Sequence, residues 1–588
     1  MHGETPRAGS AMSACRPQTA LTLGSSFLKI SSNLNAGLEI LARSGPFNRT
    51  SDNSAMARLQ ENYDVLIMGG GLSGLTLALQ LKQKHSPLRI AVVEKAKYPV
   101  PEAAHKVGES SVEIGSHYFQ DILNLRPLLK RELPKLGLRF FYTHEGNHDL
   151  SKRVELGPSD FLFVKSYQID RGRFENALVN KCIARGISFW EGSRVQELEL
   201  GNCDHQVKVL QEEQAYLFKV KWLVDASGRR SLLKQKLGLF KPTKHDINAA
   251  WFRIGCEINI DDWASNPEWR NRNRHTRRIS TNHLMGKGYW VWLIPLASGS
   301  TSIGIVADAK LHPYDEINTF PKAQAWLKEH EPQCASAVEE NLEAFQDFLA
   351  LKHFSHSSRE IYSEEGWYLT GDAGLFLDPL YSPGSDFISM SNTCITDLIT
   401  RSFTGEKLAV RVKEYERIIR TIFQGFLLIY ENQYPVMGSA KAMSLKIVWD
   451  FVMYWGGIAL IFFGGKLCDL KFIRASRVHL NKFFILNVQM QKLLLKWSSK
   501  AGEHAEKSGV FLDYSKLEFL RTLNKDLLRE KTDAELLDQL SINATLAQEI
   551  YDEILWKAKD EMPDLKEVQN LHPPQTAHVQ SFFAPLFP

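Results

Sequence analysis

The chain has 588 residues, of which 44% are hydrophobic and 11% aromatic, and it carries a formal net charge of +4. This length predicts two or more domains, and the small charge favours neither general nucleic-acid binding nor a strongly acidic partner. The cysteines lack zinc-ligand spacing, so we expect no metal, reduced thiols and a cytoplasmic protein. They are Cys15, Cys182, Cys203, Cys256, Cys334, Cys394 and Cys468.

Residues 1–55 differ in composition from the rest, being rich in Ser, Ala, Asn and Arg and poor in acidic residues. They contain no long apolar run, which argues against a secretory signal. Met56 opens MARLQENYDVLIMGGG, a natural start just before a strand. We therefore favour a misassigned start or a disordered tail, and an organellar transit peptide stays the alternative.

A strand, a glycine-rich turn and a helix follow in YDVLIMGGGLSGLTLALQLKQ, with the spacing Gly69-x-Gly71-x-x-Gly74. Glycines here allow a tight turn, the approach of a pyrophosphate to the backbone, and close helix–strand packing. A second strand, RIAVVEK, ends in Glu94, whose carboxylate can hold ribose hydroxyls. The order of elements predicts a dinucleotide site for NAD or FAD.

Three later segments favour FAD, because their order is similar to that in flavoprotein hydroxylase-type domains. They are YQIDRGRFENALV (167–179), WLVDASGRRS (222–231) and GWYLTGDAGLF (366–376). In that resemblance Arg173 lies along the cofactor, and Asp372 meets its ribityl or pyrophosphate portion.

Short alternating stretches between Asp225 and Gly371 predict an antiparallel sheet that faces the flavin as a substrate layer. Trp290 and Trp292 are two residues apart and project from one face of a strand. By pattern alone, such paired indoles are usually core residues.

Two motifs carry a more specific resemblance. Trp290-Val-Trp292-Leu-Ile294-Pro295 is similar to the WxWxIP signature of flavin-dependent halogenases, and Phe376-x-x-Pro379-x-x-Ser382-x-Gly384 to their FxxPxxSxG signature. The resemblance covers residues 60–405. The tripeptide Gly108-Glu109-Ser110 makes it closest to the branch that acts on phenols and pyrroles.

The expected fold class is α/β, with a Rossmann-type FAD-binding domain (residues 56–240 and 355–405) interleaved with an antiparallel sheet domain (241–354). A helical region (406–588) follows. Within it, Phe451–Gly465 is uncharged and apolar, which predicts a buried helix or the wall of a substrate channel, with interfacial membrane contact second.

The resemblance implies an enzyme that uses reduced FAD and dioxygen to oxidise halide to hypohalous acid, which then halogenates an aromatic carbon. Ser382 and Gly384 would cradle the halide beside the flavin, with Gly384 supplying unusual backbone angles and Ser385 or Asp386 capping the next helix. Pro383 departs from the family, because proline has no N–H to donate. A turn that only packs against the flavin therefore stays an alternative.

The family steers hypohalous acid with a lysine. Lys135, in LPKLGLRFFY, matches the lysine of the phenol branch, whereas Lys106 is expected near the FAD phosphates or in solvent. Tyr381 stands where tryptophan halogenases have a glutamate, which argues against free tryptophan as substrate. The expected substrate is a small phenol or pyrrole, hydrophobic or bound to a carrier protein.

Two other readings stay open: a monooxygenase or flavin dehydrogenase or reductase on the same scaffold, and a lipid-associated flavoprotein without turnover. No second nucleotide motif is apparent, so a separate flavin reductase is expected to supply FADH2. The run WRNRNRHTRR (269–278) predicts either a docking site for an acidic carrier protein or a solvated loop.

Overall fold

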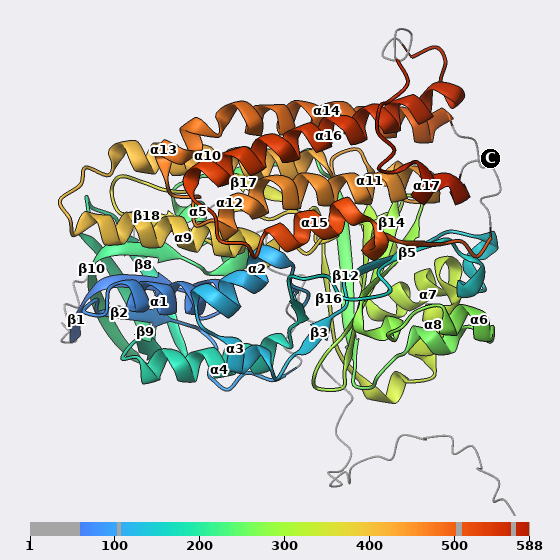
Figure 1. Ribbon diagram of the computed structural model, residues 1–588. Helices are drawn as coiled ribbons and strands as arrows, with labels where there is room; N and C mark the ends of the chain where they lie inside the picture. Colours follow the sequence, from blue (N-terminus) through green and yellow to red (C-terminus); the bar gives the residue numbers. More distant parts are fainter. Residues whose placement is uncertain (1–58, 103–106, 501–507, 566–571, 587–588) are drawn as a thin grey trace, which may run out of the picture. The chain divides into compact units, whose positions relative to one another are not determined.

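The computed structural model describes residues 59–102, 107–500, 508–565 and 572–586 (Figure 1). The predictions for residues 1–55 and for Lys106 lie outside these ranges.

A seven-stranded sheet forms the first half of the fold. Its order is β7-β2-β1-β10-β9-β8, and β18 also pairs with β10. Strands β7, β2, β1, β10 and β18 pair in parallel, and β10, β9 and β8 form an antiparallel meander. The bounds are β1 Leu59–Met68, β2 Ile90–Val93, β7 Ser188–Trp190, β8 Ser193–Glu199, β9 His205–Gln211, β10 Gln214–Asp225 and β18 Trp367–Leu369.

The strand–turn–helix unit predicted for the stretch that begins at Tyr63 is confirmed. Strand β1 leads through the glycine turn into α1 (Leu72–Lys84), which contacts both α4 (Arg171–Ala184) and α9 (Gly384–Ser402). Strand β1 ends fully buried, as expected for a parallel strand covered by helices.

An eight-stranded sheet forms the second half, in the order β16-β12-β15-β14-β13-β4-β5-β19. The five strands β16 to β13 are antiparallel, as predicted, but β4 and β19 join by parallel pairing. These additions come from outside residues 241–354. The bounds are β4 Leu138–Tyr142, β5 Glu155–Gly157, β12 Ile247–Ile254, β13 Thr281–Gly286, β14 Tyr289–Pro295, β15 Thr301–Asp308, β16 Phe345–Leu351 and β19 Phe511–Asp513.

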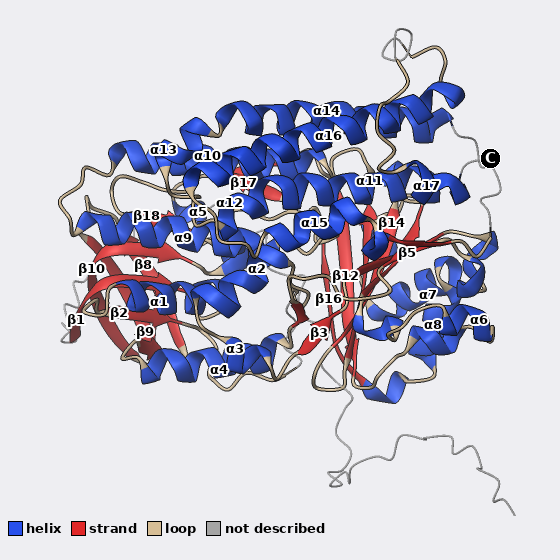
Figure 2. Ribbon diagram, viewed as in Figure 1, coloured by secondary structure: helices blue, strands red, loops and turns tan. Residues whose placement is uncertain are grey.

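The two faces of this sheet belong to different cores. Trp290 and Trp292 of β14 pack into the core shared with the first sheet. Val291 and Leu293 alternate with them and pack on the opposite face, where α7 (Phe320–His330) and α8 (Pro332–Glu339) cover the sheet (Figure 2). The tryptophan pair is therefore buried and also directed toward the FAD-type domain.

The C-terminal region is helical, and its long helices α14 and α16 pack on each other and on α11 (Figure 2). One helical stretch, Ala440–Phe463, is long and apolar enough to cross a membrane, but 83% of its most apolar window is buried. That burial is typical of a core helix, as predicted. The bounds are α10 Ala409–Leu428, α11 Ala440–Met453, the π-helical turn η11 Tyr454–Ala459, α12 Leu460–Phe463, α13 Leu470–Ala475, α14 Arg477–Lys500, α15 Glu518–Asp526 and α16 Asp533–Glu561.

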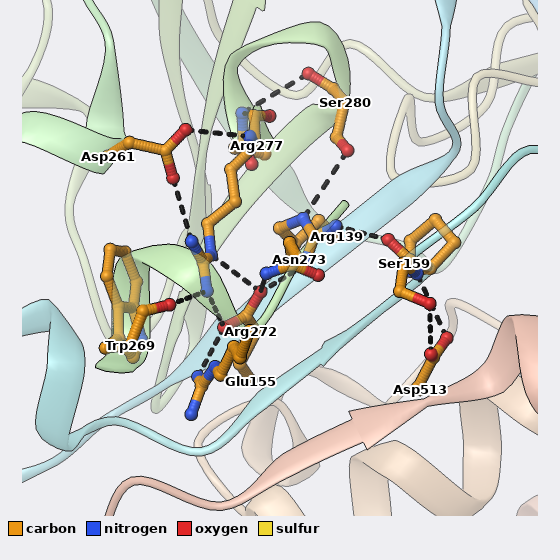
Figure 3. Close-up of polar contacts among 12 residues, drawn as sticks. Arg139, Glu155, Ser159, Asp261, Trp269, Arg272, Asn273, Arg277, Ser280 and Asp513 are labelled. Carbon is orange, nitrogen blue, oxygen red and sulfur yellow. Dashed lines mark hydrogen bonds and ion pairs between the residues drawn. The ribbon is translucent and has the colours of Figure 1, made fainter. Parts of the chain in front are cut away.

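Part of the arginine run at 269–278 is used inside the protein (Figure 3): Arg277 is buried and Arg272 is half-buried, whereas Arg270 and Arg274 are exposed to solvent. Arg272 and Arg277 converge with Arg139 on the buried carboxylate of Glu155. Burial alone would raise the pKa of Glu155, but the three guanidinium groups lower it to about 2. The remaining arginines of the run also have partners: Arg270 donates to the Ala264 carbonyl, and Arg274 and Arg278 pair with Asp160 and Glu257.

Candidate functional site

A cavity of about 600 Å³ lies where the two sheets meet, and we call it the main cavity. It is lined by the glycine turn after β1, by Glu94, by the Gly108–Ser110 tripeptide, by the tryptophan pair and by the loop before α9. Segments that are far apart in the sequence therefore line the same cavity. A cavity of this size is in the range that holds a cofactor or a small ligand.

The glycine turn is shaped for a bound pyrophosphate. A Cβ on Gly69 would lie 2.3 Å from the Ala226 carbonyl oxygen, and one on Gly74 would lie 2.0 Å from that of Gly69. A Cβ on Gly71, by contrast, would meet no protein atom within 4 Å, and Gly71 lines the cavity. The first and third glycines thus serve the fold, and the second leaves space for a ligand.

Glu94 follows the carboxyl end of β2 and lines the main cavity. Its two carboxylate oxygens accept hydrogen bonds from the N–H groups of Gly70 (2.7 Å) and Ala96 (2.8 Å). Asp372 lines the opposite side of the same cavity. Burial raises the pKa of Asp372, and Arg171, Arg229 and Lys234 offset part of that rise.

Arg173 does not line the main cavity. It faces Glu102 at 3.9 Å, whereas Arg171 lines the cavity and donates to the Val107 carbonyl. Residues two apart in a helix point to opposite sides, so only one of the pair can face the cavity. Arg171 is therefore the arginine of this helix that reaches the main cavity, and the position of Arg173 along the cofactor stays a prediction.

The two sequence signatures are joined through a residue that neither contains. Trp290 Nε1 donates to the Tyr434 hydroxyl at 3.0 Å, and that hydroxyl donates to Asp378, inside the second signature. His245 Nε2 lies 2.9 Å from the same carboxylate oxygen of Asp378. Trp292 is held separately, by donation from Nε1 to Ser302 Oγ at 3.2 Å.

Tyr434→Phe is expected to lower the free energy of unfolding by about 1–3 kcal/mol, because it leaves the buried Trp290 N–H without its acceptor and removes one of the donors to Asp378. Urea denaturation of the FAD-loaded protein measures this. Tyr216→Phe, at a partly exposed position on β10, is the control and should change little. An equal free energy of unfolding for Tyr434→Phe and the parent protein would mean that the hydrogen bonds from Trp290 to Tyr434 and from Tyr434 to Asp378 are not formed.

The loop FLDPLYSPG turns sharply before α9. Ser382, not Gly384, takes the left-handed backbone angle, with φ of 57°, and its N–H donates to the Pro379 carbonyl at 2.8 Å. Gly384 begins the helix, and a Cβ there would meet nothing within 4 Å. The expected roles are thus exchanged: Ser382 carries the strained angle, and Gly384 keeps space open in the main cavity.

No side chain caps α9. Asp386, one of the two expected caps, instead accepts hydrogen bonds from Gly115 N–H at 2.8 Å and from the Tyr454 hydroxyl at 2.6 Å. Ser385 lines the main cavity, and its buried hydroxyl has no hydrogen-bond partner within the part of the chain that the structure describes. The first N–H groups of a helix also lack intrahelical acceptors, so this end is suited to an anion.

Lys135 lies in a wall between the main cavity and a second, smaller one. Its Nζ donates to Ser110 Oγ at 2.9 Å and to the Ser111 carbonyl at 2.7 Å, and Ser110 lines the main cavity. Lys135 itself lines an apolar cavity of about 70 Å³, which we call the lysine cavity. The amine therefore connects both spaces.

Acidic and phenolic groups share the lysine cavity. Glu113, Asp386, Tyr381 and Tyr454 all line it. Burial lowers the pKa of Lys135 to about 7 and raises that of Asp386 to about 7. Near neutral pH the site can therefore exchange protons between an amine and a carboxyl group.

Comparisons with known proteins agree with this geometry. A family model described as tryptophan halogenase matches residues 154–434. A flavin-dependent halogenase of Dictyostelium discoideum is 29% identical over 452 residues, which cover 70% of this chain and 72% of that protein. The chain is thus similar to flavin-dependent halogenases over about 70% of its length.

Two further relatives extend the match. A 1H-pyrrole-2-carbonyl-[peptidyl-carrier protein] brominase of Pseudoalteromonas luteoviolacea is 26% identical over 354 residues, covering 59% of this chain and 79% of that protein. The structure of halogenase PltM with phloroglucinol and FAD superimposes with a TM-score of 0.59 at 16% identity, covering 83% of this chain and 96% of that one. The chain is accordingly an FAD-dependent oxidoreductase with the flavoprotein fold.

FAD is its cofactor, and the main cavity has the residues to hold it. Sequence reasoning missed His283, which lines the cavity and stacks on Phe140 with ring centroids 4.5 Å apart. Burial lowers the pKa of His283 to about 3, so the ring stays neutral. It also missed Asp378 and Tyr434; the first stands inside a signature, but no sequence pattern marks the second.

Proposed function

We propose that the protein uses reduced FAD, dioxygen and halide to halogenate an electron-rich phenol or pyrrole. The observation that carries this proposal is the position of the Lys135 amine in the wall between the main cavity and the lysine cavity. A halogenase needs such a group, because the oxidant is made at the cofactor and used elsewhere.

The residues of the main cavity would bind the cofactor. Gly69, Gly71 and Gly74 would admit the pyrophosphate, Glu94 would accept from the ribose, and Asp372 would face the ribityl or pyrophosphate portion. Bound reduced FAD supplies the electrons that activate dioxygen. Trp290 and Trp292 would exclude water from that side of the cavity.

The N-terminus of α9 would hold the halide. Gly384 leaves open space there, and the Ser385 hydroxyl is available, while Ser382 shapes the turn. Pro383 contributes no donor, and the Ser382 N–H is already used by Pro379. The cradle would therefore use the N–H groups of the first helical turn and the Ser385 hydroxyl.

Lys135 would donate a hydrogen bond to hypohalous acid, or accept the halogen on its amine, and pass it to the ring. A low pKa keeps the uncharged amine accessible at neutral pH. Asp386 would receive the proton that the aromatic ring releases, since burial raises its pKa to about 7.

The substrate would be a small aromatic compound, free or bound to a carrier protein as in the pyrrole brominase. A separate flavin reductase would supply FADH2. The protein would be cytoplasmic, which is the location that the cysteine pattern favours. The test is incubation with reduced FAD, dioxygen, bromide and a panel of phenols and pyrroles, with products identified by mass spectrometry. Brominated products are expected; oxygenated products without halogen would favour a monooxygenase instead.

A further inference from the structure

A third cavity, of about 410 Å³, lies among the C-terminal helices and is separate from the cofactor site. We call it the helical cavity. Its walls are α10, α11 with the π-helical turn η11, α12, α13 and α14. A cavity of this volume is large enough for a ligand, and π-helical turns are frequent at functional sites.

The helical cavity is long and mainly apolar. On α14 its lining runs from Arg477 to Asn487, which at the rise of an α-helix is about 15 Å. On α10 the lining residues recur every three or four positions, including Ile418, Ile422 and Phe426. Such a stripe normally packs on another helix, but here it faces open space.

The inner end of the helical cavity adjoins the lysine cavity. Phe426, Ile429, Asp450 and Tyr454 line both. Asp450 also accepts a hydrogen bond of 2.8 Å from Tyr381, in the loop before α9. The partition between the two spaces is therefore a thin layer of side chains that is linked to the active-site loop.

The size of the lysine cavity indicates why one substrate would occupy both the lysine cavity and the helical cavity. An apolar cavity that holds benzene measures about 150 Å³. The lysine cavity, at about 70 Å³, is too small for a substituted ring unless the shared side chains move. Their movement would join it to the helical cavity.

Two glycines keep the helical cavity open. Gly425 of α10 and Gly457 of η11 both line it, and a Cβ added at either would meet nothing within 4 Å. Glycine is unfavourable inside a helix, so neither residue is needed for the helices themselves. At the outer end, Val410 and Phe484 line the cavity while 67% and 42% exposed, so the cavity opens to solvent.

We propose that the helical cavity binds the long apolar tail of an aromatic substrate whose ring reaches Lys135. The substrate class is then a phenol or pyrrole carrying an unbranched alkyl or acyl chain. The identity of the aromatic head rests on the proposed function, whereas the binding of the tail does not.

The first test is calorimetric titration of the FAD-loaded protein with phenol, para-propylphenol, para-heptylphenol and para-nonylphenol. Affinity should rise steadily with chain length, by about fourfold for each methylene that is buried. Equal affinities along the series would overturn the proposal.

The second test narrows the cavity. Gly425→Leu and Gly457→Leu should each reduce the affinity for para-nonylphenol at least tenfold relative to that for para-propylphenol. Gly425→Ala is the control, because it raises helix propensity as Gly425→Leu does but adds only one methyl group. Its effect on the affinity ratio should be much smaller. Val478→Leu, on the cavity-lining helix α14 but outside the cavity, should leave the ratio unchanged. A ratio that Gly425→Leu and Gly457→Leu do not alter would place the tail elsewhere.

Halogenation assays on the same series separate this inference from the proposed function. If long-chain phenols bind tightly but no phenol or pyrrole is halogenated, the proposed function fails and the tail site stands. If halogenation occurs only on carrier-bound substrates and chain length has no effect on binding, the tail site fails and the proposed function stands.

Discussion

Lys135→Met is expected to lower the rate of aromatic halogenation by about a factor of a thousand or more, within the range for loss of a positioned proton-transfer group. Lys135 is the lysine that links the main cavity to the lysine cavity, and methionine keeps its bulk while removing the amine. Product formation by mass spectrometry measures the rate. FAD affinity, measured by flavin absorbance, should not change.

Two controls separate this effect from a loss of folding. Lys130→Met, at an exposed position nearby in the chain, should keep full activity. Because burial lowers the pKa of Lys135 from 10.5 to about 7, the unfolded chain binds the proton more tightly than the folded one. The stability of the parent protein should therefore rise between pH 7 and 10.5. Lys135→Met lacks this dependence, so its stability advantage should be largest below pH 7.

Lys135→Met with more than a tenth of the parent rate would mean that hypohalous acid reaches the substrate by another route. A stability advantage that grows with pH would contradict the burial of the amine.

Gly71→Val is expected to reduce FAD affinity at least a hundredfold while leaving the apoprotein folded. A Cβ at Gly71 would meet no protein atom within 4 Å, so we expect the added side chain to collide with the bound pyrophosphate rather than with the protein. Fluorescence titration with FAD measures the affinity, and thermal unfolding of the apoprotein measures the fold.

Gly74→Ala is the matched comparison, because its Cβ would lie 2.0 Å from the Gly69 carbonyl oxygen. This variant should destabilise the apoprotein itself, by about 1–3 kcal/mol or more. If Gly71→Val bound FAD normally, the cofactor would not approach this turn.

The local parts of the site could be predicted from the sequence. The spacing of Gly69, Gly71 and Gly74, and the two signatures, depend on neighbouring residues, and a turn or a strand face follows directly from such patterns. Lys135 could be chosen only through the family resemblance, because no pattern in LPKLGLRFFY indicates its contact with Ser110.

The features that the sequence did not reveal depend on contacts between distant segments. Arg173 and Arg171 are two positions apart, and only the packing of α4 decides which one faces the cavity. Glu155, which pairs with Arg272 and Arg277 of the arginine run, lies 122 positions from Arg277. Tyr434 likewise contacts Asp378 in the site, and β19 pairs with β5 in the eight-stranded sheet. Both come from the C-terminal part of the sequence, where no motif marks them.

The halide site proposed at the N-terminus of α9 is tested by mixing the protein, loaded with reduced FAD, with dioxygen in the absence of aromatic substrate. Trapped hypohalous acid is then measured with and without bromide. If the N-terminus of α9 holds a halide despite Pro383, oxidant will be trapped only when bromide is present. Identical results with and without bromide would contradict the halide site and would leave FLDPLYSPG as a turn that only packs against the flavin.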